Sequence, residues 1–445
     1  MDILSIAAQL ILCLSILVIL HECGHFFPAK WFKTRVEKFY LFFNPGFSLF
    51  KKQIGETEYG IGWIPFGGYV KISGMIDESM DTEQMEQEPQ PWEFRSKPAW
   101  QRLIIMLGGV TVNFILGIII FAGMLWYWGE SYFNAKDIEY GVFATELGKE
   151  IGIEDGDKVI SIGDFQFEKF NPALITQEIV LNDPEYLTVN RDGNNLNLPI
   201  PQNLAEKLTK YENKGKGLFG MRLPHKVASV DKNKPAGKIG LQVGDQIIGV
   251  NGESTYWLHE FAKAMSDKAE QNVDFTILRN ASDTLNVSTT IGEDGKLGIG
   301  NTLADGYYDL QRQKYSLLQA IPRGYTKSFD FLAGQIKAFK QMFTGKIKAT
   351  DSLGSVFSIA NMFDPSWDWE TFWRITAILS ILLGFFNLLP IPALDGGYVM
   401  FLIWEVVTGR KPNDKFMEYA TIAGFFILIT LMVFALGLDV SKWFK

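Results

Sequence analysis

Residues 3–20 read ILSIAAQLILCLSILVIL, and residues 21–25 continue the segment as HECGH. The first 18 of these residues carry no charge, which is the length that an α-helix needs to cross a bilayer. Only Asp2 precedes the apolar run and no small-residue cleavage site follows it, whereas a secretory signal peptide has a basic start and such a site. We therefore predict a retained membrane span, with a signal peptide as the lesser alternative.

The composition agrees with a protein that combines membrane spans with water-soluble modules. The chain has 445 residues, of which 47% are hydrophobic and 21% charged, and its mean hydropathy of +0.06 is too low for a chain embedded in lipid throughout. The formal net charge of −8, without a long basic stretch, speaks against a nucleic-acid partner. Three further apolar runs, at 103–128, 372–389 and 420–438, predict a four-span α-helical membrane protein.

Basic residues are distributed unevenly between the loops that these spans create. The segment after the first span carries six lysine and arginine residues between positions 30 and 52, and the loop 406–419 carries three more. Short cytoplasmic loops are enriched in lysine and arginine, so both segments are predicted to be cytoplasmic, although an acidic run at 77–93 weakens the signal. The long stretch between the second and third spans is then extracytoplasmic.

The extracytoplasmic stretch contains an internal repeat. IGIEDGDKVISIGD at 151–164 matches IGLQVGDQIIGVNG at 239–252, 88 residues later. Alternating apolar residues and an Asp-Gly turn between the repeats predict β-strands, so we expect two mixed-β modules at 129–224 and 225–306. A helix with one apolar face follows at 325–345, and it either lies on the membrane surface or packs on a soluble module.

The pentapeptide HECGH has an H-E-x-x-H pattern that suits a metal site. His21 and His25 are four residues apart, so on a helix both imidazoles share one face and can bind the same ion. Glu22 follows His21 directly and is placed to act as general base on a water molecule at that ion. Ionisable groups in an apolar span are costly, which favours a functional site over the alternative, a polar edge where the helix leaves the lipid.

A zinc ion that keeps one position open for water needs a third protein ligand at the same depth. Residues 387–397 read NLLPIPALDGG and end the third span on the side where the first span ends. Pro390 and Pro392 break the helix, and irregular backbone inside a membrane requires protein or a water-filled cavity around it. Asp395 is therefore the predicted third ligand, with a helix N-cap as its alternative role.

HECGH and NLLPIPALDGG together resemble the site-2 protease family of intramembrane zinc metalloproteases. PFGGYVKISGM at 65–75 and FRSKPAWQRLIIMLGG at 94–109 are similar to its bacterial regulator-of-sigma-E type, and the two modules resemble the tandem PDZ domains of that type. The resemblance implies that His21, His25 and Asp395 bind Zn²⁺ and that Glu22 activates water. It also implies a membrane-associated β-hairpin within 29–102 and a place in the bacterial cytoplasmic membrane, with the active site near the cytoplasmic side.

The same resemblance implies how substrate is held. Asn387 and Asn113 match positions proposed to hold substrate backbone or a developing oxyanion, with interhelical hydrogen bonding as an equal alternative. The segment of Gly67, Gly68 and Tyr69 belongs to the hairpin, whose edge pairs with an unwound substrate segment. Unwinding is needed because a helix buries its carbonyl groups in hydrogen bonds.

The implied substrates are single-span membrane proteins, such as an anti-sigma factor, or signal-peptide remnants, already trimmed outside the membrane. The PDZ-like modules filter them, either as peptide receptors or as a steric gate. The alternative functions are a PDZ-bearing membrane scaffold with an inactive metal site, against which an intact Glu22 speaks, and a metal transporter. The predicted segments are span one (1–28), the β-hairpin region (29–102), span two (103–128), the modules (129–224 and 225–306), an amphipathic interfacial helix region (307–370), span three (371–405), a cytoplasmic loop (406–419) and span four with the tail (420–445).

Overall fold

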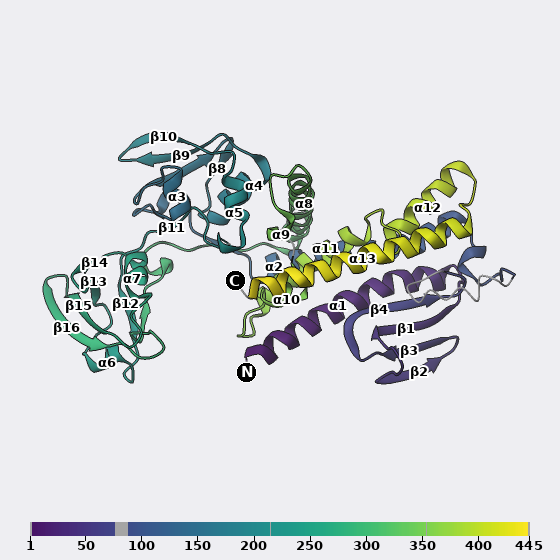
Figure 1. The fold of residues 1–445 in the computed structure, drawn as a ribbon, viewed down its shortest axis with the longest axis horizontal. Coiled ribbons are helices and arrows are strands. Elements are labelled where there is room, and N and C mark those ends of the chain that lie inside the picture. The colour runs from purple at the N-terminus through teal and green to yellow at the C-terminus, as the bar shows by residue number, and fades with distance from the viewer. Residues whose placement is uncertain (1, 76–87, 214, 353, 444–445) are drawn as a thin grey trace. The chain divides into compact units, whose positions relative to one another are not determined.

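The computed structural model describes residues 2–75, 88–213, 215–352 and 354–443, which form two compact units (Figure 1). We call the first the membrane unit; it comprises Met1–Gly129, Lys314–Lys337 and Leu353–Lys445. The second, the β unit, comprises Glu130–Gln313 and Ala338–Ser352. Most of the acidic run at 77–93 lies outside the described residues.

Within the described residues, the membrane unit contains four helices that are long and apolar enough to cross a bilayer. The predicted number of spans is therefore confirmed. Long apolar runs are helical because a helix satisfies its own backbone hydrogen bonds where lipid offers none. The spanning helices are α1 (Asp2–Trp31), α2 (Ala99–Tyr127), α11 (Trp369–Asn387) and α13 (Asp414–Trp443). The other helices are α10 (Val356–Ala360), α12 (Asp395–Thr408) and α8 (Leu317–Phe343), which belongs to this unit as far as Lys337.

Helices α1 and α2 cross in backbone contact at a pair of glycines. A Cβ atom added to Gly108 would lie 1.9 Å from the carbonyl oxygen of Gly24, and one added to Gly24 would lie 2.4 Å from the carbonyl oxygen of Gly108. Small residues allow this approach, which is a common way for membrane helices to associate. Because Gly24 is part of HECGH, the crossing lies within the predicted metal motif.

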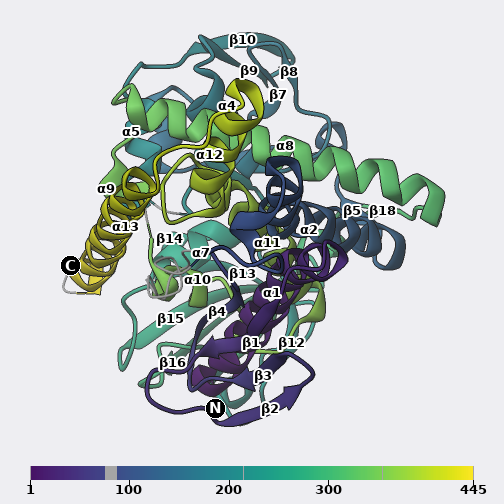
Figure 2. The same cartoon turned by 90° about the vertical axis from the view of Figure 1, so that its right-hand side faces the viewer.

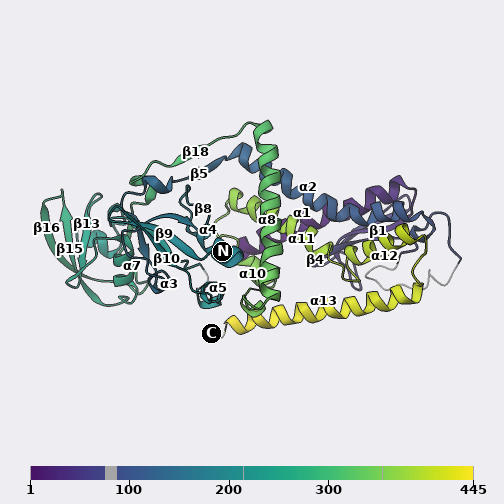
Figure 3. The same ribbon diagram turned by 90° about the horizontal axis from the view of Figure 1, so that it is seen from above.

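The third span ends where its prolines predict. Helix α11 ends at Asn387 and α12 begins at Asp395, so the segment with Pro390 and Pro392 is irregular backbone. Helix α13 approaches this segment closely, since a Cβ atom on Gly424 would lie 1.6 Å from the carbonyl oxygen of Pro392. Figure 3 shows α13 running past this broken segment and α12.

The segment after α1 forms a mixed sheet, which is larger than the predicted hairpin. Its strand order is β2-β3-β1-β4, with β1 parallel to β3 and antiparallel to β4. Strand β4 is an edge strand and lies beside α1 in Figures 1 and 2. The side chain of Val18 on α1 occupies the space next to Gly68 on β4. The strands are β1 (Val36–Phe43), β2 (Phe50–Ile54), β3 (Thr57–Ile61) and β4 (Ile64–Ile72).

The β unit contains the predicted repeat as a duplicated arrangement of strands. One module has a sheet in the order β8-β7-β9-β10 and a strand pair β6-β11; the other has β14-β13-β15-β16 and β12-β17. Arg191 pairs with the buried Asp157 in the first, and Arg279 pairs with the buried Asp245 in the second, again 88 residues later. Each module encloses its own hydrophobic core. The identity of these modules as PDZ domains stays a prediction.

The strands and helices of the β unit have the following bounds. The strands are β5 (Glu130–Tyr132), β6 (Val142–Ala144), β7 (Lys158–Ile162), β8 (Phe165–Gln166), β9 (Tyr186–Arg191), β10 (Asn194–Pro199), β11 (Phe219–Met221), β12 (Val227–Val230), β13 (Gln246–Val250), β14 (Glu253–Ser254), β15 (Asn272–Arg279), β16 (Asp283–Thr290), β17 (Ile299–Asn301) and β18 (Gln311–Gln313). The helices are α3 (Glu146–Glu150), α4 (Pro172–Asn182), α5 (Leu204–Thr209), α6 (Pro235–Lys238), α7 (Leu258–Met265) and α9 (Ala349–Ser352).

Candidate active site

Three potential metal-ligand atoms from two distant segments come together in the membrane unit. The Nε2 atoms of His21 and His25 are 3.3 Å apart, and Oδ2 of Asp395 lies 3.4 Å from the first and 3.3 Å from the second. Both histidines are buried and Asp395 is half-buried. The three atoms form an almost equilateral triangle, which we call the ligand triangle.

The ligand triangle fits zinc. A tetrahedral zinc ion bound at about 2.0–2.2 Å keeps its nitrogen and oxygen ligands about 3.3–3.5 Å apart. The Asp395 Oδ2 atom is buried without a hydrogen-bond partner in the described part of the chain, as expected of an oxygen reserved for an ion. His25 Nδ1 lies 2.8 Å from the carbonyl oxygen of Ile105, so Nδ1 carries the proton and Nε2 keeps its lone pair for the metal.

The position of Asp395 in its helix does not match the alternative role of a cap. Asp395 is the first residue of α12, and the N-cap position belongs to Leu394, which makes no side-chain capping bond. The Asp395 carboxylate instead faces the two imidazoles. Gly396 and Gly397 allow this turn, since a Cβ atom on either would lie 2.3 Å or 2.6 Å from a backbone carbonyl oxygen of the broken segment.

A cavity of about 680 Å³ opens beside the ligand triangle. Its walls come from α1, the edge strand β4, the segment between α11 and α12, and α13. Glu22 lines it, and so does Val70 of β4. The cavity therefore places an acidic side chain, the ligand triangle and an edge strand around one space.

The substrate-binding residues implied by the resemblance divide into two groups. Asn387, the last residue of α11, has its amide nitrogen 3.3 Å from His21 Nε2 and lines the cavity together with Gly68 and Tyr69. Gly67 is not among the lining residues; its φ of +84° bends β4 against the ring of Phe43. Asn113 is also not among them, and it is fully buried behind His21, with its amide nitrogen 2.9 Å from His21 Nδ1.

Sequence reasoning missed two parts of this site. The backbone carbonyl group of Ile105 acts regardless of its side chain, so no residue pattern reveals it. Sequence reasoning also missed one face of α13. The residues of this face repeat at helical spacing, but α13 is apolar around its whole circumference. The sequence therefore does not indicate which face lines a cavity. These lining residues are Thr421, Phe425, Leu428, Ile429 and Met432.

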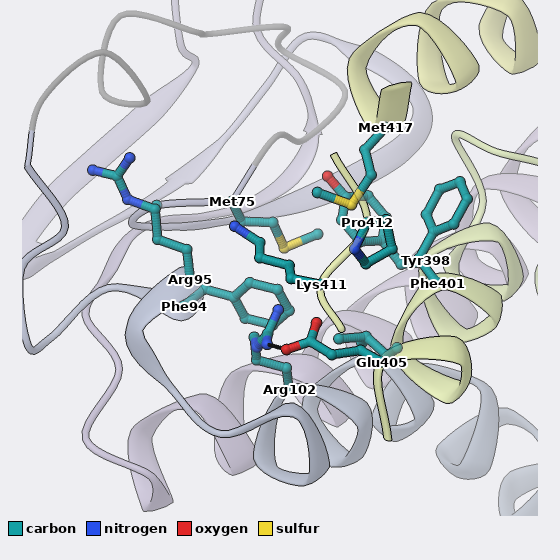
Figure 4. A pocket seen from close by; sticks show the side chains of 12 residues that line it. Met75, Phe94, Arg95, Arg102, Tyr398, Phe401, Glu405, Lys411, Pro412 and Met417 are labelled. Atoms are coloured by element: carbon teal, nitrogen blue, oxygen red, sulfur yellow. Dashed lines mark hydrogen bonds and ion pairs between the residues drawn. The ribbon is translucent and has the colours of Figure 1, made fainter. Parts of the chain in front are cut away.

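A buried ion pair connects α2 to the helix that begins with Asp395. Arg102 of α2 donates to Glu405 of α12 (Figure 4). Arg102 also donates to the carbonyl oxygen of Lys97 at 2.9 Å. The side chains of Arg102 and Glu405 are only 8% and 16% exposed. The pair therefore fixes α12 against α2 at the end opposite to the metal ligand.

Replacing Arg102 with methionine should destabilise the membrane unit by about 3–5 kcal/mol, because it leaves the Glu405 charge buried without this partner. Thermal unfolding of the detergent-purified protein measures the effect. The double substitution Arg102→Met with Glu405→Met removes both charges and should recover most of the loss. A single variant as stable as the wild type would show that the ion pair does not hold α12.

Comparison with known proteins agrees with this geometry. The family model of peptidase family M50 matches residues 9–431. The regulator of sigma E protease of Haemophilus influenzae is 27% identical and aligned over 96% of this chain and 97% of its own, and the regulator of sigma-E protease RseP of Escherichia coli is 26% identical over 98% of both. A protein of Rickettsia conorii named as a zinc metalloprotease is 27% identical over 98% of both chains. Since the family model spans nearly the whole chain, from the first membrane helix to the last, the protein belongs to peptidase family M50 and is an intramembrane zinc metalloprotease of the site-2 type.

Proposed function

We propose that this protease hydrolyses a peptide bond within or near the membrane segment of single-span proteins, with His21, His25 and Asp395 as the zinc ligands. The observation that carries the proposal is the ligand triangle, whose edges measure 3.3–3.4 Å, on the wall of a cavity that also holds Glu22 and the edge strand β4. Zinc, when bound, polarises the scissile carbonyl and makes water a stronger nucleophile.

Glu22 is the general base in this proposal. It lines the cavity next to His21, where its carboxylate can reach a water molecule at the metal position. It takes a proton from water during attack and gives the proton to the departing amine nitrogen. With Zn²⁺ bound, the carboxylates of Asp395 and Glu22 would balance the two charges of the ion, so a neutral substrate backbone can enter without a large electrostatic cost.

The substrate is held in an extended form, since a helix cannot expose its scissile carbonyl to attack. The segment of Gly67, Gly68 and Tyr69 on β4 adds the unwound chain as a further strand. Gly68 and Tyr69 supply the cavity side of that strand, and Gly67 supplies the bend next to it. Asn387 borders the metal position and donates its amide to the substrate backbone or the developing oxyanion.

The two modules of the β unit filter substrates on the extracytoplasmic side, and the ligand triangle lies near the cytoplasmic side. The basic loops at the inner ends of the spans support this orientation. The relatives named regulators of sigma E favour a membrane-bound anti-sigma factor as one substrate, and signal-peptide remnants are the other class. The filter admits chains that an earlier protease has trimmed.

The test is cleavage of a single-span model substrate with a short outer tail, by the wild type and by Glu22→Gln in membranes. Loss of a general base lowers the rate by about 10²–10⁴-fold, so cleavage should fall by at least that factor while zinc content stays unchanged. A second substrate with a folded outer domain should be cleaved more slowly by the wild type. Equal cleavage by both proteins would overturn the role of Glu22, and no cleavage by either would favour a scaffold.

A further inference from the structure

Asn113 occupies a position that does not suit contact with substrate. Its side chain is 0% exposed and contributes nothing to the wall of the 680 Å³ cavity. The side-chain amide lies 2.9 Å from His21 Nδ1, the ring nitrogen that faces away from the ligand triangle. The backbone carbonyl oxygen of Asn113 accepts a hydrogen bond of 2.7 Å from Ser380 of α11. Asn113 is thus fixed behind the histidine.

The proton on His21 decides which amide atom faces it. His21 Nε2 belongs to the ligand triangle and must keep its lone pair for a metal, so Nδ1 carries the proton and needs an acceptor. With the amide nitrogen toward His21, two donors would face each other at 2.9 Å. The oxygen and nitrogen of an asparagine amide are distinguished by their hydrogen bonds, and Asn113 Oδ1 has no partner in the described residues that would hold it on the other side.

His25 provides the matching case. Its Nδ1 lies 2.8 Å from the carbonyl oxygen of Ile105, which is eight residues before Asn113 and therefore about two turns away on α2. The histidines are one turn apart on α1, and the antiparallel helix α2 offers one carbonyl group to each of them. A carbonyl acceptor on the outer nitrogen fixes the tautomer and the ring plane of a metal-binding histidine.

We propose that Asn113 is a positioning residue for the metal centre: its side-chain carbonyl accepts the Nδ1–H of His21 and holds the imidazole with Nε2 toward the ion. The inference rests on the proposed role of His21 as a ligand. It replaces the role of a substrate contact, because a donor to substrate would need its N–H in the cavity. It keeps the interhelical hydrogen bond and specifies its partner as a metal ligand.

The experiment measures zinc affinity of the full-length, detergent-purified protein by competition with a chelator. Asn113→Leu removes the acceptor at similar volume and should weaken zinc binding by about 10–100-fold, the usual loss for such partners of metal ligands. Asn113→Asp keeps an acceptor oxygen and should bind zinc within a few-fold of the wild type. The absorption spectrum of the cobalt-substituted protein should change in Asn113→Leu, because the ring of His21 is no longer held in plane.

Ser380→Ala is the matched control, since it removes a buried hydrogen bond from α11 to the backbone of Asn113 and leaves the Asn113 side chain and His21 untouched. It should leave zinc affinity and the cobalt spectrum unchanged. If Asn113→Leu does not fold, Asn113→Ala takes its place in the same measurements, because alanine also lacks an acceptor and adds no bulk. Equal loss in Ser380→Ala would overturn the proposal in favour of general packing. A different result would also overturn the proposal: zinc affinity that is unchanged in Asn113→Leu, together with turnover that is reduced equally in Asn113→Leu and Asn113→Asp. That result would favour an amide donor to substrate.

The same measurements separate this inference from the assignment of the ligands. Asp395→Asn, included in the series, should lose zinc more severely than any Asn113 variant. Zinc binding that is equal in the wild type and in Asp395→Asn would contradict the ligand triangle itself. Loss in Asp395→Asn together with full binding in Asn113→Leu would leave the ligand triangle intact and contradict only the role of Asn113.

Discussion

The Asp395→Asn variant should bind zinc more weakly than the wild type by more than about 100-fold, since loss of a partner behind a ligand already costs about 10–100-fold. Cleavage of the model substrate should fall to background. The carboxylate is one of three ligand atoms and the only charged one, and its Oδ2 atom has no other hydrogen-bond partner within the described residues. Metal analysis after dialysis against a chelator series gives the affinity.

Asparagine is the informative substitute because it caps helices about as well as aspartate. If Asp395 only began α12, Asp395→Asn would keep its stability and its zinc, and Asp395→Ala would lose stability. We expect the opposite pattern: both variants lose zinc equally, and their unfolding temperatures in the metal-free state differ little from that of the metal-free wild type. Retained zinc in Asp395→Asn would remove this residue from the metal centre.

Replacing Gly108 with alanine should destabilise the membrane unit by about 3 kcal/mol or more, at the upper end of the usual cost of overpacking. The added methyl group would lie 1.9 Å from the carbonyl oxygen of Gly24, so α1 and α2 must move apart. The movement also carries His25 away from its Ile105 acceptor, because His25 follows Gly24 directly. We therefore expect a lower unfolding temperature and weaker zinc binding in the same variant.

Gly123 provides the control for this substitution. It lies on the same helix α2, and a Cβ atom there would meet nothing within 4 Å. Alanine is a better helix former than glycine, so Gly123→Ala should be neutral or slightly stabilising. Gly108→Ala with the stability and zinc affinity of the wild type would show that the two helices do not touch at this point.

The spans and the metal-binding residues could be predicted because their signals are local. An uncharged run of 18 residues identifies a span, and the four-residue spacing of His21 and His25 places two imidazoles on one face of a helix. Asp395 is distant in sequence, yet the prolines before it predict a helix break at the right depth, and the structure has that break. The roles of these residues remain proposals.

Features that depend on distant pairing could not be predicted from residue patterns. Strand β1 pairs in parallel with β3, with Lys38 opposite Glu58, and a parallel pair leaves no turn signal between its strands. The predicted hairpin was therefore too small. The position of Asn113 behind His21 likewise depends on how α2 packs on α1, which the glycine contact at Gly24 determines and which the residue type alone does not reveal.

The proposed pairing of substrate with β4 has a consequence for which proteins can be degraded. Hydrogen bonding to the edge of a sheet involves main-chain groups, which are the same in every sequence, so such an edge discriminates poorly between polypeptides. Here that edge borders a walled cavity among membrane helices, where an intact helix has no main-chain groups to offer. If β4 pairs with substrate as proposed, the ease with which a target helix unwinds in lipid should set the rate of cleavage. We then expect fast cleavage of targets with glycine, proline or polar residues near mid-membrane, and slow cleavage of uniformly leucine-rich segments.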